Sequence, residues 1–177
     1  MKIIKALLLL FLVSTTLLAN DFEFDVTPLS CDFLGAVKFN ERVILYGTNG
    51  MTLYSEDNCQ TWEQETIGRN NYNILKMKKC DQQLIGLLSH GWVVSSTDGE
   101  HWSWHFITDK SFLDFDYYDG KIYILDYDSI LVCKDFNVEA KFALQHDTLD
   151  EFSKEIKISN GKAVVASSST KLEIYDL

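Results

Sequence analysis

The sequence predicts an all-β protein assembled from a short repeated unit, and two observations support this. Residues 54–62 read Tyr-Ser-Glu-Asp-Asn-Cys-Gln-Thr-Trp and residues 94–102 read Val-Ser-Ser-Thr-Asp-Gly-Glu-His-Trp, so a similar segment returns after about forty residues. Short apolar runs also alternate with turn residues along most of the chain, which is typical of antiparallel strands. A repeat of this length favours a solenoid or a propeller.

Both copies of the repeated segment place a serine two residues before an aspartate and end on a tryptophan. We expect Ser55 and Asp57 to fold their side chains back onto N–H groups of the loop, and Ser96 and Asp98 to do the same. The tryptophan then begins the next strand with a large apolar face for packing. Each segment is therefore predicted to be a hairpin loop.

These residues resemble the Asp-box, or BNR, repeat, whose pattern is Ser/Thr-x-Asp-x-Gly-x-Thr-Trp. Two positions depart from it, because Cys59 replaces the glycine of the first copy and His101 replaces the threonine of the second. Without that glycine, Asn58 is expected to take the left-handed conformation. The residues that match the pattern are Ser55, Asp57, Thr61 and Trp62 in the first copy and Ser96, Asp98, Gly99 and Trp102 in the second.

The resemblance implies a propeller in which the motif closes the loop between the third and fourth strands of a blade. Sialidases, sortilin-type receptors and photosystem II assembly factors share the motif, so it marks a fold and assigns no activity. The third copy has lost the motif at residues 133–137. The implied architecture is a small β-propeller of about four blades, each of four antiparallel strands.

The expected strands can be laid along the chain as three complete units and one unit that is a strand short. Residues 21–26 alternate charged and apolar side chains, and their spacing to the next strand matches that of a fourth strand. We expect them to pair with the C-terminal blade and close the ring; an incomplete arc that dimerises is the alternative. The strands are predicted at 37–39, 43–46, 51–54, 61–66, 73–78, 83–88, 92–95, 102–107, 112–117, 121–125, 130–133, 140–144, 155–158, 163–166 and 172–175.

The first residues carry an export signal. Lys2 and Lys5 precede an apolar run over residues 6–18, and Ala19 follows that run. This predicts a signal peptide over 1–19 and a single domain over 20–177, in the periplasm or outside the cell. An uncleaved anchor is the alternative.

The formal net charge of -10 argues against some classes of partner. Nucleic acids and anionic membranes both attract basic surfaces, so neither is an expected partner, and no membrane contact is expected after signal cleavage.

The cysteines permit disulfides in an exported chain. Cys59 and Cys80 fall in loops on the same face of adjacent blades, so we predict a Cys59–Cys80 disulfide that would contribute roughly 3 kcal/mol. In this prediction Cys31 and Cys133 stay free thiols. The alternative is that no disulfide forms and all four cysteines are buried thiols.

No catalytic machinery stands out. The sialidases that share the motif clamp their substrate carboxylate with three arginines, whereas this chain has only Arg42 and Arg69. Acidic pairs for a generic glycosidase are plentiful and none is distinguished. No nucleophile elbow, phosphate loop or dinucleotide fingerprint is present. We therefore predict a protein that is not an enzyme and uses no cofactor.

Two sets of residues have the composition of a metal site without its geometry. His101 and His105 would lie about 13 Å apart on one strand, too far to share an ion. An acidic tract lacks the glycine and the bidentate glutamate of an EF-hand loop, so a solvated face is favoured. No metal is predicted. The tract comprises Asp114, Asp116, Asp119, Asp126 and Asp128.

The aromatic residues suggest where a partner could bind. The resemblance places Trp62 and Trp102 between blades, and Trp104 is expected on the same packed strand face as Trp102. Trp92 and Tyr117–Tyr118 lie beside turns, where an exposed ring would serve as a contact for a protein or glycan.

The functional prediction is an exported, non-catalytic binding or assembly module for a protein partner, as a monomer or dimer. The alternative is a carbohydrate-active enzyme or glycan-binding module that uses acidic and aromatic loop residues. Two carboxylates roughly 5 to 10 Å apart in a pocket beside an exposed aromatic ring would favour it.

Overall fold

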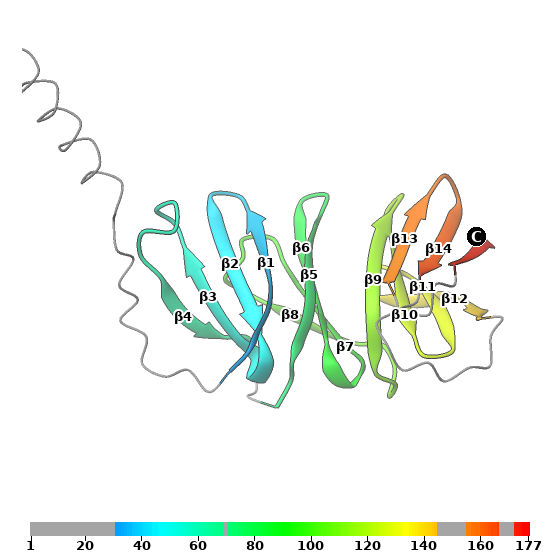
Figure 1. Cartoon of the computed structure of the whole chain (residues 1–177), viewed down its shortest axis with the longest axis horizontal. Coiled ribbons are helices and arrows are strands. Elements are labelled where there is room, and N and C mark those ends of the chain that lie inside the picture. The colour runs from blue at the N-terminus through cyan, green and yellow to red at the C-terminus, as the bar shows by residue number, and fades with distance from the viewer. Residues whose placement is uncertain (1–30, 69–70, 145–154, 167–171) are drawn as a thin grey trace, which may run out of the picture. The chain divides into compact units, whose positions relative to one another are not determined.

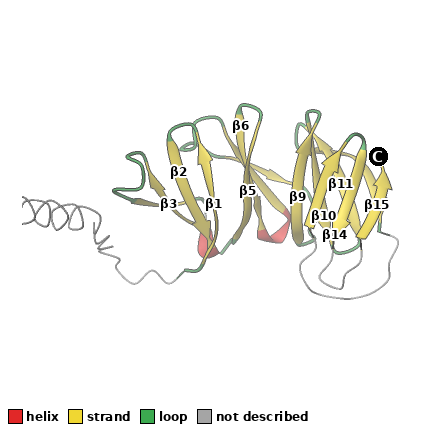
Figure 2. Cartoon of the chain, turned by 45° about the horizontal axis from the view of Figure 1, so that its top comes forward, coloured by secondary structure: helices red, strands yellow, loops and turns green. Residues whose placement is uncertain are grey.

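In the computed structural model the chain is built from antiparallel strands (Figure 1). The structure describes residues 31–68, 71–144, 155–166 and 172–177. Two single-turn 3-10 helices, η1 (Thr48–Gly50) and η2 (Ser89–Gly91), link the second and third strands of the first two sheets (Figure 2). Neither of these short helices, nor any other helix within the described ranges, has the length and apolarity that a bilayer crossing needs.

The strands form four sheets in chain order, which we call blades 1 to 4, and each strand pairs with its neighbour in sequence. Blade 1 holds β1 (Phe33–Phe39), β2 (Arg42–Gly47), β3 (Met51–Ser55) and β4 (Glu63–Thr66); blade 2 holds β5 (Ile74–Cys80), β6 (Gln83–Leu88), β7 (Trp92–Ser96) and β8 (Ser103–Phe106); blade 3 holds β9 (Phe112–Tyr118), β10 (Lys121–Asp126), β11 (Ser129–Lys134) and β12 (Asn137–Ala143); and blade 4 holds β13 (Glu155–Ser159), β14 (Lys162–Ala166) and β15 (Leu172–Asp176).

The predicted all-β architecture of four antiparallel blades is confirmed. Blade 4 has three strands within the described residues. Its predicted fourth strand, residues 21–26, lies outside those residues, as does the predicted signal peptide 1–19.

Turn residues with positive φ join the strands of several hairpins within the described residues. Asp119–Gly120 and Asn160–Gly161 have positive φ at both positions, which matches the right-handed twist of the flanking strands. Asp135–Phe136 has the same conformation and closes β11 onto β12. Blade 3 therefore has a two-residue turn where the first two blades have the longer loop, and β12 begins three residues before the predicted start.

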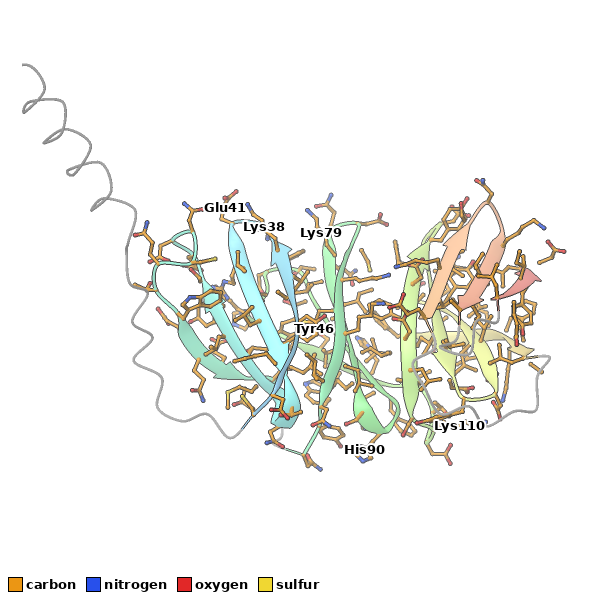
Figure 3. All side chains as sticks on the ribbon, viewed as in Figure 1. Lys38, Glu41, Tyr46, Lys79, His90 and Lys110 are labelled. Atoms are coloured by element: carbon orange, nitrogen blue, oxygen red, sulfur yellow. The ribbon has the colours of Figure 1, made fainter. Side chains whose placement is uncertain are left out.

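The core lies between neighbouring blades rather than in one central cluster. Each junction buries the apolar face of one sheet against that of the next; at the first junction Tyr46 of blade 1 points toward β5 (Figure 3). The junctions are centred on Phe39, Ile44, Ile74, Leu84 and Val94 for blades 1 and 2, on Ile85, Leu87, Phe115, Ile124 and Leu131 for blades 2 and 3, and on Leu125, Ile130, Ile156, Ala163 and Val165 for blades 3 and 4.

Polar contacts also cross the first strands of blades 2, 3 and 4. The Lys76 ammonium of β5 bonds Oδ1 of Asp114 on β9, and Oδ2 of the same carboxylate accepts the N–H of Ile156 on β13 at 2.9 Å. Asp114 is buried. One carboxylate thus satisfies a lysine on one side and a strand-edge N–H on the other, which covers an edge that would otherwise need a partner.

A second set of contacts repeats this arrangement two residues further along each strand, and we call each such lysine–aspartate–N–H set a rung. Lys78 Nζ lies 2.6 Å from Asp116 Oδ1, and the N–H of Ile158 donates to Asp116 Oδ2 at 2.8 Å. Burial alone would raise the pKa of Asp116, but the bonds from Lys78 and Ile158 hold it below its usual value. The two rungs tie three blades together.

Replacing Asp114 tests the first rung. Asp114→Ala leaves the Lys76 ammonium and the Ile156 N–H without their acceptor, so the free energy of unfolding should fall by roughly 3 to 5 kcal/mol. Urea denaturation followed by tryptophan fluorescence measures it. Asp119→Asn is the matched control, since Asp119 is exposed in a turn with positive φ that asparagine tolerates. Equal, small losses in both variants would contradict the structural role of Asp114.

Candidate functional site

The first serine–aspartate loop is held by its own side chains. Asp57 Oδ1 accepts the N–H groups of Gln60 at 3.0 Å and Thr61 at 2.8 Å, and Asp57 Oδ2 accepts the Thr61 hydroxyl at 2.6 Å. Ser55 Oγ donates to Asp57 and accepts the Cys59 N–H at 2.9 Å. The predicted folding of both side chains onto the loop is confirmed.

The second loop repeats the design. Asp98 Oδ1 accepts the N–H groups of Glu100 and His101, each at 2.8 Å, and Asp98 Oδ2 lies 2.8 Å from His101 Nδ1. Ser96 Oγ donates to Asp98 and accepts the Gly99 N–H. These bonds lower the pKa of Asp98, and the Asp98 carboxylate raises the pKa of His101. His101 therefore takes the place of the threonine hydroxyl of the first loop.

The two loops differ in backbone conformation. Asn58 has φ 59, as predicted, but Cys59 also has positive φ at 67, whereas Gly99 provides the left-handed residue of the shorter second loop at φ 84. The missing glycine is thus replaced by two left-handed residues that both carry a β-carbon; asparagine tolerates this region, whereas Cys59 is strained there.

The tryptophans that end the loops lie immediately before β4 and β8 rather than inside them. Trp102 and Trp104 pack against the cluster between blades 1 and 2, as expected. Trp62 is half-buried, and its indole N–H has no hydrogen-bond partner among the described residues.

Arg42, at the start of β2, joins the two loops. Its Nη2 lies 2.5 Å from Glu56 in the first loop and 2.6 Å from Glu100 in the second, and its Nη1 donates to the Gly99 carbonyl. The guanidinium also lies 4.3 Å from the ring centroid of Tyr54. The ion pairs and the hydrogen bond of Arg42 therefore link the loops of blades 1 and 2.

The predicted Cys59–Cys80 disulfide is not formed, since Cys59, Cys80, Cys31 and Cys133 are all free thiols. Cys80 ends β5 with its side chain in the cluster between blades 2 and 3, which is directed away from the blade that carries Cys59. Shared loop position was thus a poor guide to side-chain direction. Burial raises the pKa of Cys80 to about 12, so this thiol is unreactive.

Arg42→Ala should weaken the junction of blades 1 and 2. We expect the free energy of unfolding to fall by about 1 to 2 kcal/mol, because charged hydrogen bonds are lost while both carboxylates remain half in solvent. Chemical denaturation measures it, with the exposed neighbour substitution Glu41→Ala as control. Equal free energies of unfolding for the two variants would show that the Arg42 contacts do not stabilise the fold.

The aspartate loops should also contribute to the pH dependence of stability in acid. Hydrogen bonds from Thr61, Ser55 and Gln60 lower the pKa of Asp57 to about 2. Since this is below its unfolded value of about 4, the stabilisation is complete above pH 4 and is lost as the pH falls toward 2. Thermal melts from pH 7 to 2 should show Asp57→Asn less stable than the parent at neutral pH, with the gap narrowing below pH 4. A constant gap would contradict this.

An aromatic cluster forms where blades 1 and 2 meet, near η2. Tyr72, from the β4–β5 loop, lies edge-on to His90, Trp92 and Trp104, with ring centroids 5.9, 6.3 and 5.4 Å apart. Trp92 continues the contacts to Trp104 at 5.8 Å and to Phe106 at 5.1 Å. We call these five residues the aromatic cluster.

The aromatic cluster is rigid on one side and exposed on the other. Trp92 and Trp104 pack on the core between blades 1 and 2, and the backbone at Gly68 lies directly against the Trp104 ring. Phe106, by contrast, is 56% exposed. His90 lies at the end of the blades opposite Glu41 and Lys79 (Figure 3). Of the cluster, only Trp92 was predicted as a possible partner contact, because loop Tyr72 and strand Phe106 give no sequence signal of their proximity.

A small cavity lies at the other end of blades 2 and 3. It has a volume of about 160 Å³ and mixes acidic, amide and aromatic side chains. The Tyr117 hydroxyl donates to Asp81 at 2.6 Å, which raises the pKa of Tyr117 to about 12. The lining residues are Cys80, Asp81, Gln82, Gln83, Ile85, Tyr117, Gly120, Ile122, Asp135 and Phe136.

The candidate metal residues have structural contacts. His101 bonds Asp98, whereas His105 stacks on Phe136 with centroids 3.6 Å apart. In the acidic tract, Asp126 accepts two loop N–H groups and Asp128 pairs with Lys110 at 2.7 Å. No group of three or more potential ligands gathers within the described residues.

Comparison with known proteins identifies the fold. No protein-family model and no curated protein matches the chain. Among solved structures, the chain is similar to the computationally designed Ika4 protein, with TM-score 0.62, 8% identity and 86% of this chain covering 95% of that one. It is also similar to YCF48 bound to D1 peptide, with TM-score 0.57, 16% identity and coverage of 86% and 54%. The β-propeller domain of Cps50 (Swd1) from Myceliophteria thermophila gives TM-score 0.63, 8% identity and coverage of 83% and 54%.

The fold is a β-propeller. At these identities the likeness concerns architecture alone. The chain spans about half the length of the YCF48 and Cps50 chains that it matches, and nearly the whole of Ika4.

Proposed function

We propose that this protein is an exported, non-catalytic propeller module that binds a protein partner through the aromatic cluster. The observation that carries the proposal is the exposed ring of Phe106 over the interlocked rings of Trp92, Trp104, Tyr72 and His90. Rings of this kind dominate the energetics of protein interfaces because they bury a large area with little loss of conformational freedom.

The surroundings of the aromatic cluster support a binding role. Trp92 and Trp104 are already fixed by the core, so a partner would order only Phe106 and the edges of its neighbours. Preorganised contacts of this kind lose little free energy on association. The net charge of -10 favours a partner segment that is apolar or basic rather than a nucleic acid or an anionic membrane.

The proposal also assigns the repeated loops to the Asp-box type. The loops around Asp57 and Asp98 are read as Asp boxes that shape blades and do not contact ligand, since their carboxylates are occupied by loop donors. YCF48, a propeller of similar fold, is known in a structure bound to D1 peptide, which is an example of a propeller holding a peptide. Export would follow from the predicted signal over residues 1–19 and place the module in the periplasm or outside the cell.

The second candidate is a glycan-binding module at the cavity of blades 2 and 3. Asp81 and Asp135 line the cavity together with Gln82 and the rings of Tyr117 and Phe136. Carboxylates and amides that bond hydroxyl groups, beside rings that stack on sugar faces, suit a ligand the size of a monosaccharide. The volume of about 160 Å³ is small, so a longer glycan would contact the cavity through one sugar unit.

Crosslinking capture with the full chain tests the main proposal. Phe106→Arg should reduce recovery of the specifically crosslinked partner at least tenfold, because a charge would replace the ring that the partner covers in the complex. Tyr118→Arg is the matched control, since Tyr118 is an exposed ring on β9, outside the aromatic cluster.

Two outcomes would overturn the proposal. Equal recovery with both variants would remove the aromatic cluster as the binding surface. Saturable binding of a free sugar that is lost in Asp135→Asn, without any partner lost in Phe106→Arg, would favour the glycan-binding candidate.

A further inference from the structure

The first and last blades each have one sheet face that no other blade covers within the described residues. Blade 1 packs against blade 2 through one face, and blade 4 packs against blade 3 through one face. Blades 2 and 3, in contrast, are buried on both faces. The two uncovered faces can be compared with the buried ones residue by residue, because all four blades share the same strand register.

In blade 1 the uncovered face carries apolar residues at positions that are core elsewhere. The cross-strand row Ala36–Leu45–Leu53 corresponds to Met77–Gly86–Val94 in blade 2 and to Phe115–Ile124–Leu131 in blade 3. Both of those rows lie in junctions with the preceding blade.

Phe33 shows the same contrast. It pairs with the last residue of β2, as Ile74 pairs with the last residue of β6 and Phe112 with that of β10. Ile74 and Phe112 are 0% and 3% exposed, whereas Phe33 is 41% exposed. The outer face of blade 1 thus has the apolar residues that, in blades 2 and 3, pack against the preceding blade.

Blade 4 presents the complementary face. Its row Glu155–Ala166–Leu172 corresponds to Asp114–Leu125–Ile130 of blade 3. Leu125 and Ile130 are fully buried against blade 4, yet Leu172 is 62% exposed. Ile174 is 58% exposed, although its counterpart Val132 is buried. The outer face of blade 4 thus has apolar residues at the positions that, in blade 3, pack against the following blade.

We propose that these faces dock a second copy of this chain, with blade 4 of each copy packed on blade 1 of the other. The two faces are the two halves of a junction that the chain already makes between each pair of consecutive blades, so each is shaped for the other. A two-fold axis repeats the junction and closes the assembly, which is the usual geometry of homodimers. The matched YCF48 and Cps50 propellers contain about as much chain again, which is what a second copy would supply.

A polar contact is available to the same junction. Glu155 occupies the position of Asp114, whose carboxylate accepts the Ile156 N–H of the next blade. Ala36 occupies the position of Ile156 in blade 1. Glu155 of one copy would therefore accept the Ala36 N–H of the second copy and extend the ladder of carboxylates across the junction.

Light scattering coupled to size exclusion tests the proposal on the full chain without any partner. The expected mass is twice that of one chain. A monomeric mass at every concentration overturns the proposal and favours closure of one chain on itself by residues 21–26. This result would leave binding at the aromatic cluster unaffected, since that surface lies at the junction of blades 1 and 2.

Charged substitutions on the two faces locate the interface. Phe33→Arg and Ile174→Arg should each weaken the dimer by roughly tenfold or more, because each buries a charge in an apolar junction. Both residues are exposed in the single chain, so the variants should keep the parent's circular dichroism, and their melting temperature should match that of the parent at concentrations where the parent is dissociated. Val138→Arg, at an exposed site on the outer strand β12, is the control and should remain dimeric.

Mixing the two variants tests the head-to-tail arrangement. A Phe33→Arg chain and an Ile174→Arg chain together form one junction in which both faces are unchanged. The mixture should therefore dimerise more strongly than either variant alone. No gain on mixing would overturn the pairing of blade 4 with blade 1, and a dimer weakened by only one substitution would point to contact between like faces.

Discussion

The structure depends on the packing of one blade's face against the face of the next. A sheet of this size buries too little by itself to be stable, and each blade becomes a core element only when its neighbours cover it. The buried residues accordingly fall into three clusters, one at each junction. Stability is therefore distributed along the chain, and the first and last blades depend on whatever covers their outer faces.

Polar contacts along the first strands and at the loops fix how neighbouring sheets align. Along the first strands, Asp114 and Asp116 join lysines of β5 to the N–H groups of β13. At the loops, Arg42 joins Glu56 to Glu100. Apolar faces alone tolerate sliding, whereas directional bonds of this kind select one register. The same contacts hold the aromatic cluster in place, because its rings belong to elements of blade 2 and to the loop that leads into blade 2.

The sequence allowed the strands and the two aspartate loops to be predicted because their signals are local. Alternating apolar runs and turn residues located every strand of the described residues to within a few positions. The early start of β1 was missed because Gly35 interrupts its pattern; this glycine leaves room for the Tyr46 ring. Features that join blades were not predictable. The partners of Asp114 lie on other blades, and the direction of the Cys80 side chain, which excluded the disulfide, is decided by the packing of blade 3.

Amide hydrogen exchange resolved by peptide tests the central claim, that junctions rather than single sheets carry the stability. The slowest exchange should lie in the central strands of blades 2 and 3, which are buried on both faces: β6 (Gln83–Leu88), β7 (Trp92–Ser96), β10 (Lys121–Asp126) and β11 (Ser129–Lys134). Exchange in β3 and β14 should be faster and should slow as protein concentration rises. Slower exchange in β3 and β14 than in the central strands of blades 2 and 3, at low protein concentration, would contradict it.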